Sequence, residues 1–329
     1  MSGESQGGEI AEPECAVTPL LGLETLATQA SAPGGQQHRM SRVRVVIPSL
    51  VGDLPQLTSM CDTAIREGAS PVVIANSSRL YRKLVAARIP HLTSRRNDGF
   101  AASVILGAEG DWDWLVILND DLTFDPDDLA PCLSAQTLDA LHPAAIVYFD
   151  DGSARHLPTQ LGVLLSVSLL SNIARRAFPR WHRTRLEGTE TFRAFSAVAI
   201  GRQVWDRVGG LDSRYPFSYE DADFVRRARA LGVQVSAMRT GVVHQHSRTS
   251  GRFVTAVLPV ATWSALEYLT KWFGKRTLHR WLLVFALGVR APIAAATMPQ
   301  PRKQIRAVAN AARALVADDR PSLPEWESA

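Results

Sequence analysis

The sequence predicts an α/β fold in which a mostly parallel sheet is covered by helices on both faces. Three observations support this prediction: short apolar, β-branched runs, helical patterns between them, and polar residues directly after the runs. Strands that alternate with helices in this way are typical of βαβ units. The 329 residues are long enough for one large catalytic domain with an appendage or for two modest domains.

The first half of the chain has the clearest pattern. We expect strands at 43–48, 72–75 and 114–118, and helices at 54–67, 78–87 and 99–108. The second half is less regular between residues 151 and 190. After it we expect a strand at 195–201, a helix at 203–208, a tight turn at Gly209-Gly210 and strands at 233–238 and 242–244.

A further helix is expected from residue 220 to Leu231. It would place Phe224, Ala228 and Leu231 on one face, and Gly232 would end it. Residues 1–40 are rich in Gly, Ser, Glu and Pro without sustained periodicity, so we expect a disordered arm there.

Composition and charge narrow the class of protein. Hydrophobic residues make up 46% and charged residues 21%, which excludes a wholly disordered or fibrous chain. The net charge of +4 is too small to indicate a class of binding partner. The three cysteines form no C-x-x-C pair, so a disulfide scaffold and a thiolate zinc site are not supported and a reducing cytosol fits best. No basic residue precedes Arg39, so we expect no export signal, and the apolar stretch 282–298 is short for a membrane-spanning helix.

Polar residues follow three of the expected strands. They are Ser49, Asn76-Ser77-Ser78 and Asn119-Asp120-Asp121, and ligands of such sheets bind beyond the carboxyl ends of the strands. No glycine-rich dinucleotide or P-loop motif follows any strand, which argues against both of those nucleotide-binding classes.

Adjacent carboxylates at Asp120 and Asp121 repel each other unless a cation joins them. Mg²⁺ or Mn²⁺ prefers such oxygen ligands, but Asn and Asp are also common in turns, so both interpretations stay open. By contrast, the acids of Asp125-Pro126-Asp127-Asp128 are explained by helix capping.

Two later clusters have the same ambiguity. The first turn of the expected helix contains three acids, Glu220, Asp221 and Asp223. The helix dipole alone favours acids at this position, although one of them could be a general base. His244 and His246 lie two apart near a strand end and so share a face, which suits either a metal site or a structural role.

In this order, the motifs resemble glycosyltransferase family 2, which has the GT-A fold. The motifs that carry the resemblance are Asn97-Asp98-Gly99-Phe100-Ala101, Asn119-Asp120-Asp121, Val208-Gly209-Gly210-Leu211-Asp212, Tyr219-Glu220-Asp221-Ala222-Asp223-Phe224 and Val243-His244. The match covers about residues 43–250 and is most similar to the bacterial rhamnosyl- and galactofuranosyl-transferase branch. The resemblance implies a GT-A domain at 41–255, a Rossmann-like mixed sheet, and a helical extension at 256–329.

The resemblance also implies roles for single residues. Asp121 matches the last position of the family's D-x-D metal motif, with Asn119 in place of its first acid, and His244 and His246 are further candidate ligands of Mg²⁺ or Mn²⁺. Asp221 matches the catalytic base, beside Glu220. The candidate donor-binding residues are Pro48, Ser49, Asn76, Asn97, Gly99 and Asp120.

The implied reaction is inverting transfer from a nucleotide-diphospho-sugar to a hydroxyl of a cell-envelope glycan or a lipid-linked acceptor. Two positions depart from the family pattern: Ala75 replaces the aspartate that reads the base, and Ile105 replaces an asparagine. These departures keep a non-catalytic nucleotide-sugar-binding or scaffold protein open as the alternative. A nucleotidyltransferase is a weaker one.

The C-terminal segment is basic and aromatic. Between Trp263 and Arg313 nine basic residues stand against Glu267 alone, a local charge of +8. Such a segment could lie on an anionic membrane, which we favour, or could form a helical cap on the catalytic domain. No nucleic-acid-binding motif is present, so we expect no nucleic-acid partner. Together with the cysteine usage, the basic segment leads us to expect a cytoplasmic protein that is peripheral to the inner face of the plasma membrane.

Overall fold

The computed structural model describes residues 40–141, 145–150, 154–177, 191–244 and 253–324. All of them belong to one compact unit, Met40–Ala329. The expected N-terminal arm and His246 lie outside the described residues.

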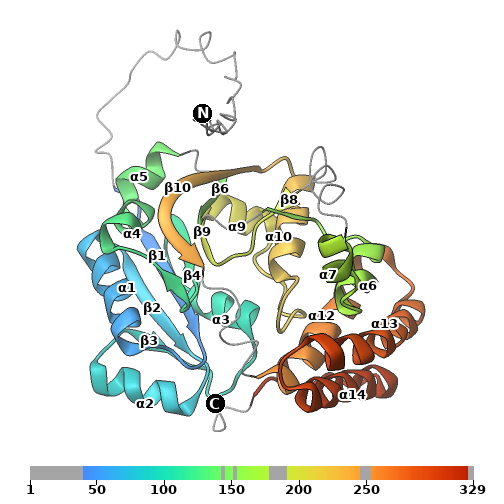
Figure 1. Ribbon diagram of the computed structural model, residues 1–329. Helices are drawn as coiled ribbons and strands as arrows, with labels where there is room; N and C mark the ends of the chain where they lie inside the picture. Colours follow the sequence, from blue (N-terminus) through green and yellow to red (C-terminus); the bar gives the residue numbers. More distant parts are fainter. Residues whose placement is uncertain (1–39, 142–144, 151–153, 178–190, 245–252, 325–329) are drawn as a thin grey trace, which may run out of the picture. The chain divides into compact units, whose positions relative to one another are not determined.

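An eight-stranded sheet forms the centre of this unit (Figure 1). The strand order is β3-β2-β1-β4-β9-β6-β10-β5, and β7 and β8 form a separate small ribbon. The strands are β1 (Val43–Ser49), β2 (Ser70–Ala75), β3 (His91–Leu92), β4 (Trp114–Leu118), β5 (Leu122–Thr123), β6 (Ala145–Asp150), β7 (Arg155–His156), β8 (Thr191–Phe192), β9 (Ala197–Gly201) and β10 (Gln234–His244).

The sheet is mixed, as the resemblance implied, and in the described part of the chain four of its strand pairings are parallel and three are antiparallel. β1 is parallel to both β2 and β4, but β9 lies antiparallel between β4 and β6. β10 is parallel to β6 and antiparallel to β5. A central strand buried on both faces is a continuous apolar run in either direction, so the sequence of β9 does not indicate its direction.

Helices cover both faces of the sheet. Because successive strand residues point to opposite faces, Val45 and Ile47 pack with α1, α2, α4 and α5, whereas Val46 packs with α3, α9 and α10. These helices are α1 (Leu54–Arg66), α2 (Ser78–Ala87), α3 (Phe100–Gly107), α4 (Pro126–Leu133), α5 (Ala135–Ala140), α9 (Arg202–Val208) and α10 (Glu220–Ala230).

Capping residues set several of these boundaries. The Ser77 hydroxyl accepts a hydrogen bond from the Leu80 amide at the start of α2, and the Asp125 carboxylate accepts one from the Asp127 amide at the start of α4. Gly232 follows α10 with a φ of 73°. Leu231, expected on the buried face of that helix, is 38% exposed because α10 ends one residue before it.

The second half differs most from expectation. The two strands expected at 233–238 and 242–244 form one strand, β10, whose register with β6 shifts between Ala237 and Val242. Sequence patterns make no prediction for β6, for β7, or for the helices α6 (Gln160–Val167) and α7 (Leu170–Ala177).

The helices α12 (Val254–Phe273), α13 (Arg276–Thr297) and α14 (Pro301–Ala317) follow the sheet. They form a third apolar cluster together with α6, and Figure 1 shows them beside α6 and α7. Tyr268 of α12 is fully buried in the cluster on the α10 face of the sheet, which joins the C-terminal helices to the sheet.

Candidate active site

A large cavity lies at the carboxyl ends of β1, β2 and β4. Its volume is about 1110 Å³, and it continues past the start of α10 to walls formed by α6 and α12. Every predicted site residue that the structure describes lines it: Pro48, Ser49, Asn76, Asn97, Gly99, Asp120, Asp121, Glu220, Asp221 and His244.

Asp120 lines the cavity just after the end of β4. The Ser49 hydroxyl at the end of β1 donates a hydrogen bond of 2.5 Å to Asp120 Oδ2. Burial raises the pKa of Asp120, the hydrogen bond from Ser49 opposes that rise, and the charge of Asp121 adds to it. Asp120 is thus hydrogen-bonded within the protein, and Asp121 lines the cavity beside it.

Asp121 and His244 meet across the edge of the sheet. His244 is the last residue of β10 and pairs with Leu122 of β5. Because Asp121 directly precedes Leu122, this antiparallel register brings the side chains of Asp121 and His244 close together. The distance from His244 Nε2 to Asp121 Oδ1 is 2.9 Å, and the two side chains are 14% and 13% exposed. Asn119 Nδ2 is 3.4 Å from the same imidazole nitrogen.

This pair fits a divalent cation only in part. A carboxylate and an imidazole are donors that Mn²⁺ accepts, while Mg²⁺ prefers oxygen and takes few protein ligands, with phosphate and water completing its shell. Within the described ranges no group of three or more His, Cys, Asp or Glu side chains could hold a metal ion. An ion held by Asp121 and His244 would therefore need further ligands, from water or from a bound molecule.

Asn76 and Asn97 also line the cavity. The Ser103 hydroxyl lies 3.0 Å from Asn76 Oδ1 and 2.7 Å from the Gly99 carbonyl, which fixes the amide at the end of β2. Asn97 Oδ1 accepts a hydrogen bond from the Gly99 amide, and its Nδ2 donates to the Pro324 carbonyl. Ala75, which departs from the pattern of the similar family, is fully buried in the core. The polar side chain that lines the cavity at the end of β2 is that of Asn76.

Gly99 lines the cavity and contacts the loop before α10. It has a φ of 96°, and an added Cβ would overlap the Pro216 carbonyl. The Phe100 amide donates a hydrogen bond of 3.3 Å to that same carbonyl. Gly99 is thus required for a close backbone contact, a role that the sequence pattern did not reveal.

Glu220 and Asp221 begin α10 after two left-handed residues, Ser218 and Tyr219, with φ of 69° and 73°. Burial raises the pKa of Asp221 to about 6, opposed by the hydrogen bond from the Ala222 amide and by the charge of Arg155. Burial and the charge of Asp221 raise the pKa of Glu220 well above its ordinary value. Glu220 is 7% exposed, and its Oε2 has no hydrogen-bond partner within the described part of the chain.

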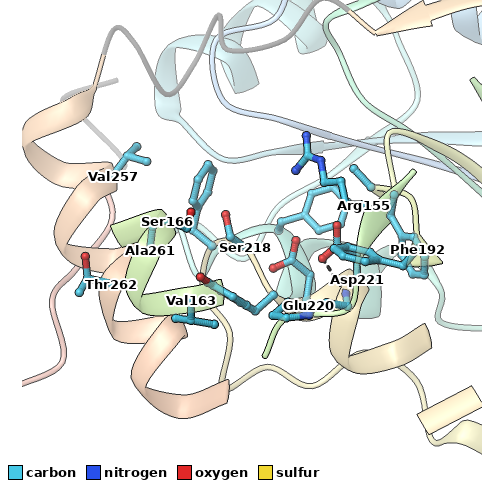
Figure 2. A pocket seen from close by; sticks show the side chains of 18 of the residues that line it. Arg155, Val163, Ser166, Phe192, Ser218, Glu220, Asp221, Val257, Ala261 and Thr262 are labelled. Atoms are coloured by element: carbon cyan, nitrogen blue, oxygen red, sulfur yellow. Dashed lines mark hydrogen bonds between the residues drawn. The ribbon is translucent and has the colours of Figure 1, made fainter. Parts of the chain in front are cut away.

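Figure 2 shows how the cavity extends from this pair. Arg155, Phe192 and Asp221 lie at one end, Val257, Ala261 and Thr262 of α12 lie at the other, and Glu220, Ser218, Val163 and Ser166 lie between them. Sequence reasoning identifies none of the residues from α6, β7, β8 and α12. Their segments carry no motif, and only the three-dimensional fold brings them to the acids.

Asp223, the third acid of the cluster, has a structural role. It is fully buried and accepts hydrogen bonds from Arg227 Nε at 2.8 Å, Lys271 Nζ at 2.9 Å and Trp272 Nε1 at 2.9 Å. It therefore anchors α12 to α10.

The basic C-terminal segment is partly neutralised within the protein. Lys271 contacts Asp212 and Asp223, Arg276 contacts Glu267 and Asp318, and Arg280 also contacts Asp318. Five of the nine basic side chains are exposed: Lys275, Arg302, Lys303, Arg306 and Arg313. The local charge available to a partner is thus smaller than the sequence count suggests.

One helix in the described part of the chain, α13, is by length and composition apolar enough to cross a membrane. It bears an exposed apolar ridge of Leu278, Trp281 and Phe285, which are 50%, 51% and 72% exposed. The absence of a membrane-spanning helix therefore remains a prediction.

The protein has a mixed α/β fold with a large cavity at the carboxyl ends of its strands β1, β2 and β4. No protein-family model and no curated protein sequence matches the chain.

Among solved structures, the chain is similar to the catalytic domain of Drosophila β1,4-galactosyltransferase 7 in complex with xylobiose, at 14% identity and a TM-score of 0.36, over 63% of this chain and 72% of that one. It is also similar to the inositol-1-phosphate CTP transferase of T. maritima, at 11% identity and a TM-score of 0.35, over 63% of this chain and 90% of that one.

Proposed function

We propose that this protein is an inverting, metal-dependent glycosyltransferase that moves a sugar from a nucleotide-diphospho-sugar to a hydroxyl of a cell-envelope glycan or glycolipid. The observation that carries the proposal is the meeting of two acidic clusters in one cavity. Asp121 with His244 lines one part of it, and Glu220 with Asp221 lines the next. The sequence motifs that resemble glycosyltransferase family 2 supply these same residues.

Asp221 acts as the general base in this proposal. With a pKa of about 6 it is mostly ionised at neutral pH and still basic enough to accept a proton from an acceptor hydroxyl. The hydroxyl oxygen bonds to the anomeric carbon, the bond to the nucleoside diphosphate breaks, and the proton remains on Asp221. No covalent intermediate is required.

Glu220 binds a sugar hydroxyl. A buried carboxyl without a partner is costly, and a ligand hydroxyl would supply the missing hydrogen bond to Oε2. Asp121 and His244 would hold Mg²⁺ or Mn²⁺, which supplies positive charge to the departing diphosphate. Ser49, Asn76 and Asn97 bind the donor beside them.

A panel of nucleotide sugars with Mn²⁺ tests the proposal through release of nucleoside diphosphate. Asp221→Asn should lower turnover by about 10² to 10⁴ yet keep the donor-induced thermal shift. Asp62→Asn, which removes an exposed carboxylate on α1, should change neither. Donor binding without turnover by the natural chain would favour the non-catalytic alternative. Release of pyrophosphate would identify a nucleotidyltransferase.

Peripheral membrane contact belongs to the same proposal. Trp281 and Phe285 on the exposed ridge of α13 would enter the lipid interface, and the exposed cations of α14 would attract anionic headgroups. Sedimentation with phosphatidylglycerol vesicles should exceed that with phosphatidylcholine vesicles and should fall in Phe285→Ser. Equal sedimentation of the natural chain and this variant would argue that the ridge stays in water.

A further inference from the structure

A short segment after α14, residues 318–324, runs from the C-terminal helices to the cavity; we call it the strap. Its first residue, Asp318, is left-handed with a φ of 53°, and α14 ends just before it at Ala317. The Asp318 carboxylate lies 3.0 Å from Arg276 Nη2 and 3.1 Å from Arg280 Nη1, both on α13. The start of the strap is thus tied to the helices that precede it.

Two hydrogen bonds attach the rest of the strap to loops around the sheet. Arg320 Nη2 donates one of 3.4 Å to the Ser213 carbonyl, in the loop before α10. The Pro324 carbonyl accepts one of 3.2 Å from Asn97 Nδ2, in the loop before α3. Pro321 and Pro324 have restricted φ angles, which limits the conformations that the strap can adopt. The strap therefore crosses from the C-terminal helices to the loop that carries Asn97.

Leu323 and Pro324 of the strap line the cavity together with Asn76, Asn97 and Gly99. Both strap residues are partly exposed, and the cavity has a volume of about 1110 Å³ with the strap in place. This volume is at the upper end for sites that bind small molecules. The strap is therefore a wall of the cavity and does not fill it.

A chain of hydrogen bonds connects the strap to the end of β2. Asn97, which donates to the strap, accepts a hydrogen bond of 3.3 Å from the Gly99 amide, and the Gly99 carbonyl lies 2.7 Å from the Ser103 hydroxyl. That hydroxyl lies 3.0 Å from Asn76 Oδ1. The strap thus belongs to the same bonded framework as the polar side chain at the end of β2.

The end of β2 lies apart from the acids of the cavity. β1 separates β2 from β4, the strand that precedes Asp121. Two strand spacings amount to roughly 10 Å. In the proposed function the diphosphate lies at Asp121 and His244 and the sugar lies at Asp221. The nucleoside is then the part of the donor that is left to reach the end of β2 and the strap.

We propose that the strap covers the nucleoside of the donor, with Leu323 and Pro324 packing against it and Asn97 holding the strap in place. The inference rests on the proposed function, since it adds a wall to the donor site of that reaction. Apolar side chains add affinity by removing the apolar surface of a base or ribose from water. Asn97 is a positioning residue, because its Oδ1 and one Nδ2 hydrogen are used within the protein; the second Nδ2 hydrogen is left for the donor.

Titration calorimetry on the full chain with Mn²⁺ tests the strap without any need for turnover. UDP, GDP and dTDP are titrated, and the one that binds most tightly is compared with inorganic pyrophosphate, which lacks the nucleoside. Leu323→Ala should weaken the nucleoside diphosphate about fivefold or more and leave pyrophosphate unchanged. Ser322→Ala is the matched control, because this side chain is exposed on the same strap and does not line the cavity, so it should change neither.

A double-mutant cycle tests whether Asn97 acts through the strap. The carboxylate of Asn97→Asp can still accept the Gly99 amide but cannot donate to the Pro324 carbonyl. It should weaken the nucleoside diphosphate in the natural chain and have a clearly smaller effect in Leu323→Ala, because both changes release the same wall. If pyrophosphate binds too weakly to be measured, this cycle carries the test.

Tighter or unchanged binding of the nucleoside diphosphate by Leu323→Ala would overturn the inference, and tighter binding would mean that the strap competes with the donor. An equal loss in Ser322→Ala, an equal loss for pyrophosphate, or additive effects in the cycle would overturn it too. Turnover that persists with no effect of Leu323→Ala refutes only the strap. No binding of any of the three diphosphates, no turnover and no effect of Asp221→Asn refute the proposed function.

Discussion

Replacing Asp221 by asparagine should stabilise the protein while it removes activity. The side chain is partly buried, and burial raises the pKa of its carboxyl from 3.8 to about 6, so its ionised form is disfavoured in the folded state. A difference of about two pKa units corresponds to about 3 kcal/mol between the folded and unfolded states. Asp221 accepts a hydrogen bond of 2.7 Å from the Ala222 amide, and the amide oxygen of the Asp221→Asn side chain can still accept it.

The sign follows from which state binds the proton more tightly. Because the folded-state pKa is the higher one, the stability contributed by this carboxyl is fully present below pH 3.8 and is lost as the pH rises to about 6. The side chain of the Asp221→Asn variant stays neutral throughout. The free energy of unfolding of the variant should therefore exceed that of the natural chain by about 3 kcal/mol at pH 8 and by less than about 1 kcal/mol at pH 4.

Urea unfolding at pH 4, 5, 6 and 8 measures this difference, with Asp62→Asn as the exposed control. A difference between the natural chain and Asp221→Asn that does not grow with pH would refute the assignment of Asp221 as a buried, ionised group. In the natural chain, kcat/KM should rise with pH and level off above about pH 6, because the base must be deprotonated. Turnover of the variant should fall by about 10² to 10⁴.

Three other substitutions give separate tests. Asp223→Ala should lower the free energy of unfolding by about 3 to 5 kcal/mol in a urea titration, because it leaves buried cations without their partner. Gly99→Ala should be less stable than Gly110→Ala, since both have φ near 95° but only Gly99 is pressed against the Pro216 backbone; equal losses would mean that this contact is not needed. Asp121→Asn should abolish the Mn²⁺ dependence of the donor-induced thermal shift, and a shift that still depends on Mn²⁺ would place the ion elsewhere.

The sequence was sufficient to predict some of the local elements, mainly in the first half of the chain. The strand at 114–118 and the helix at 78–87 have the bounds expected from their patterns, because a run of buried apolar residues and a Ser77 cap are local signals. Direction and pairing are not local: β9 reads as a buried strand, but its antiparallel place between β4 and β6 depends on the long connection before it. For the same reason, the sequence did not predict that α6 and α12 line the cavity.

The charges of the C-terminal segment illustrate the same limit. Counting residues 263–313 gives +8, yet the carboxylates that pair with Lys271, Arg276 and Arg280 include Asp212, Asp223 and Asp318, which lie outside that window. Hydrogen bonds from Arg214 and Lys271 outweigh burial and hold the pKa of Asp212 well below its ordinary range. What remains exposed is the ridge of α13 and a few cations, so membrane contact would depend more on Trp281 and Phe285 than on total charge.

The three acids at the start of α10 show how structure separates roles that sequence leaves equal. The helix dipole favours Glu220, Asp221 and Asp223 alike. Asp223 is surrounded by bonded cations, whereas Glu220 and Asp221 have raised pKa values, face the cavity and follow two strained left-handed residues. A helix cap needs neither an orphaned carboxyl nor that strain. The unfavourable features gather on the two acids that line the cavity, which is the pattern expected where a site is maintained at the expense of stability.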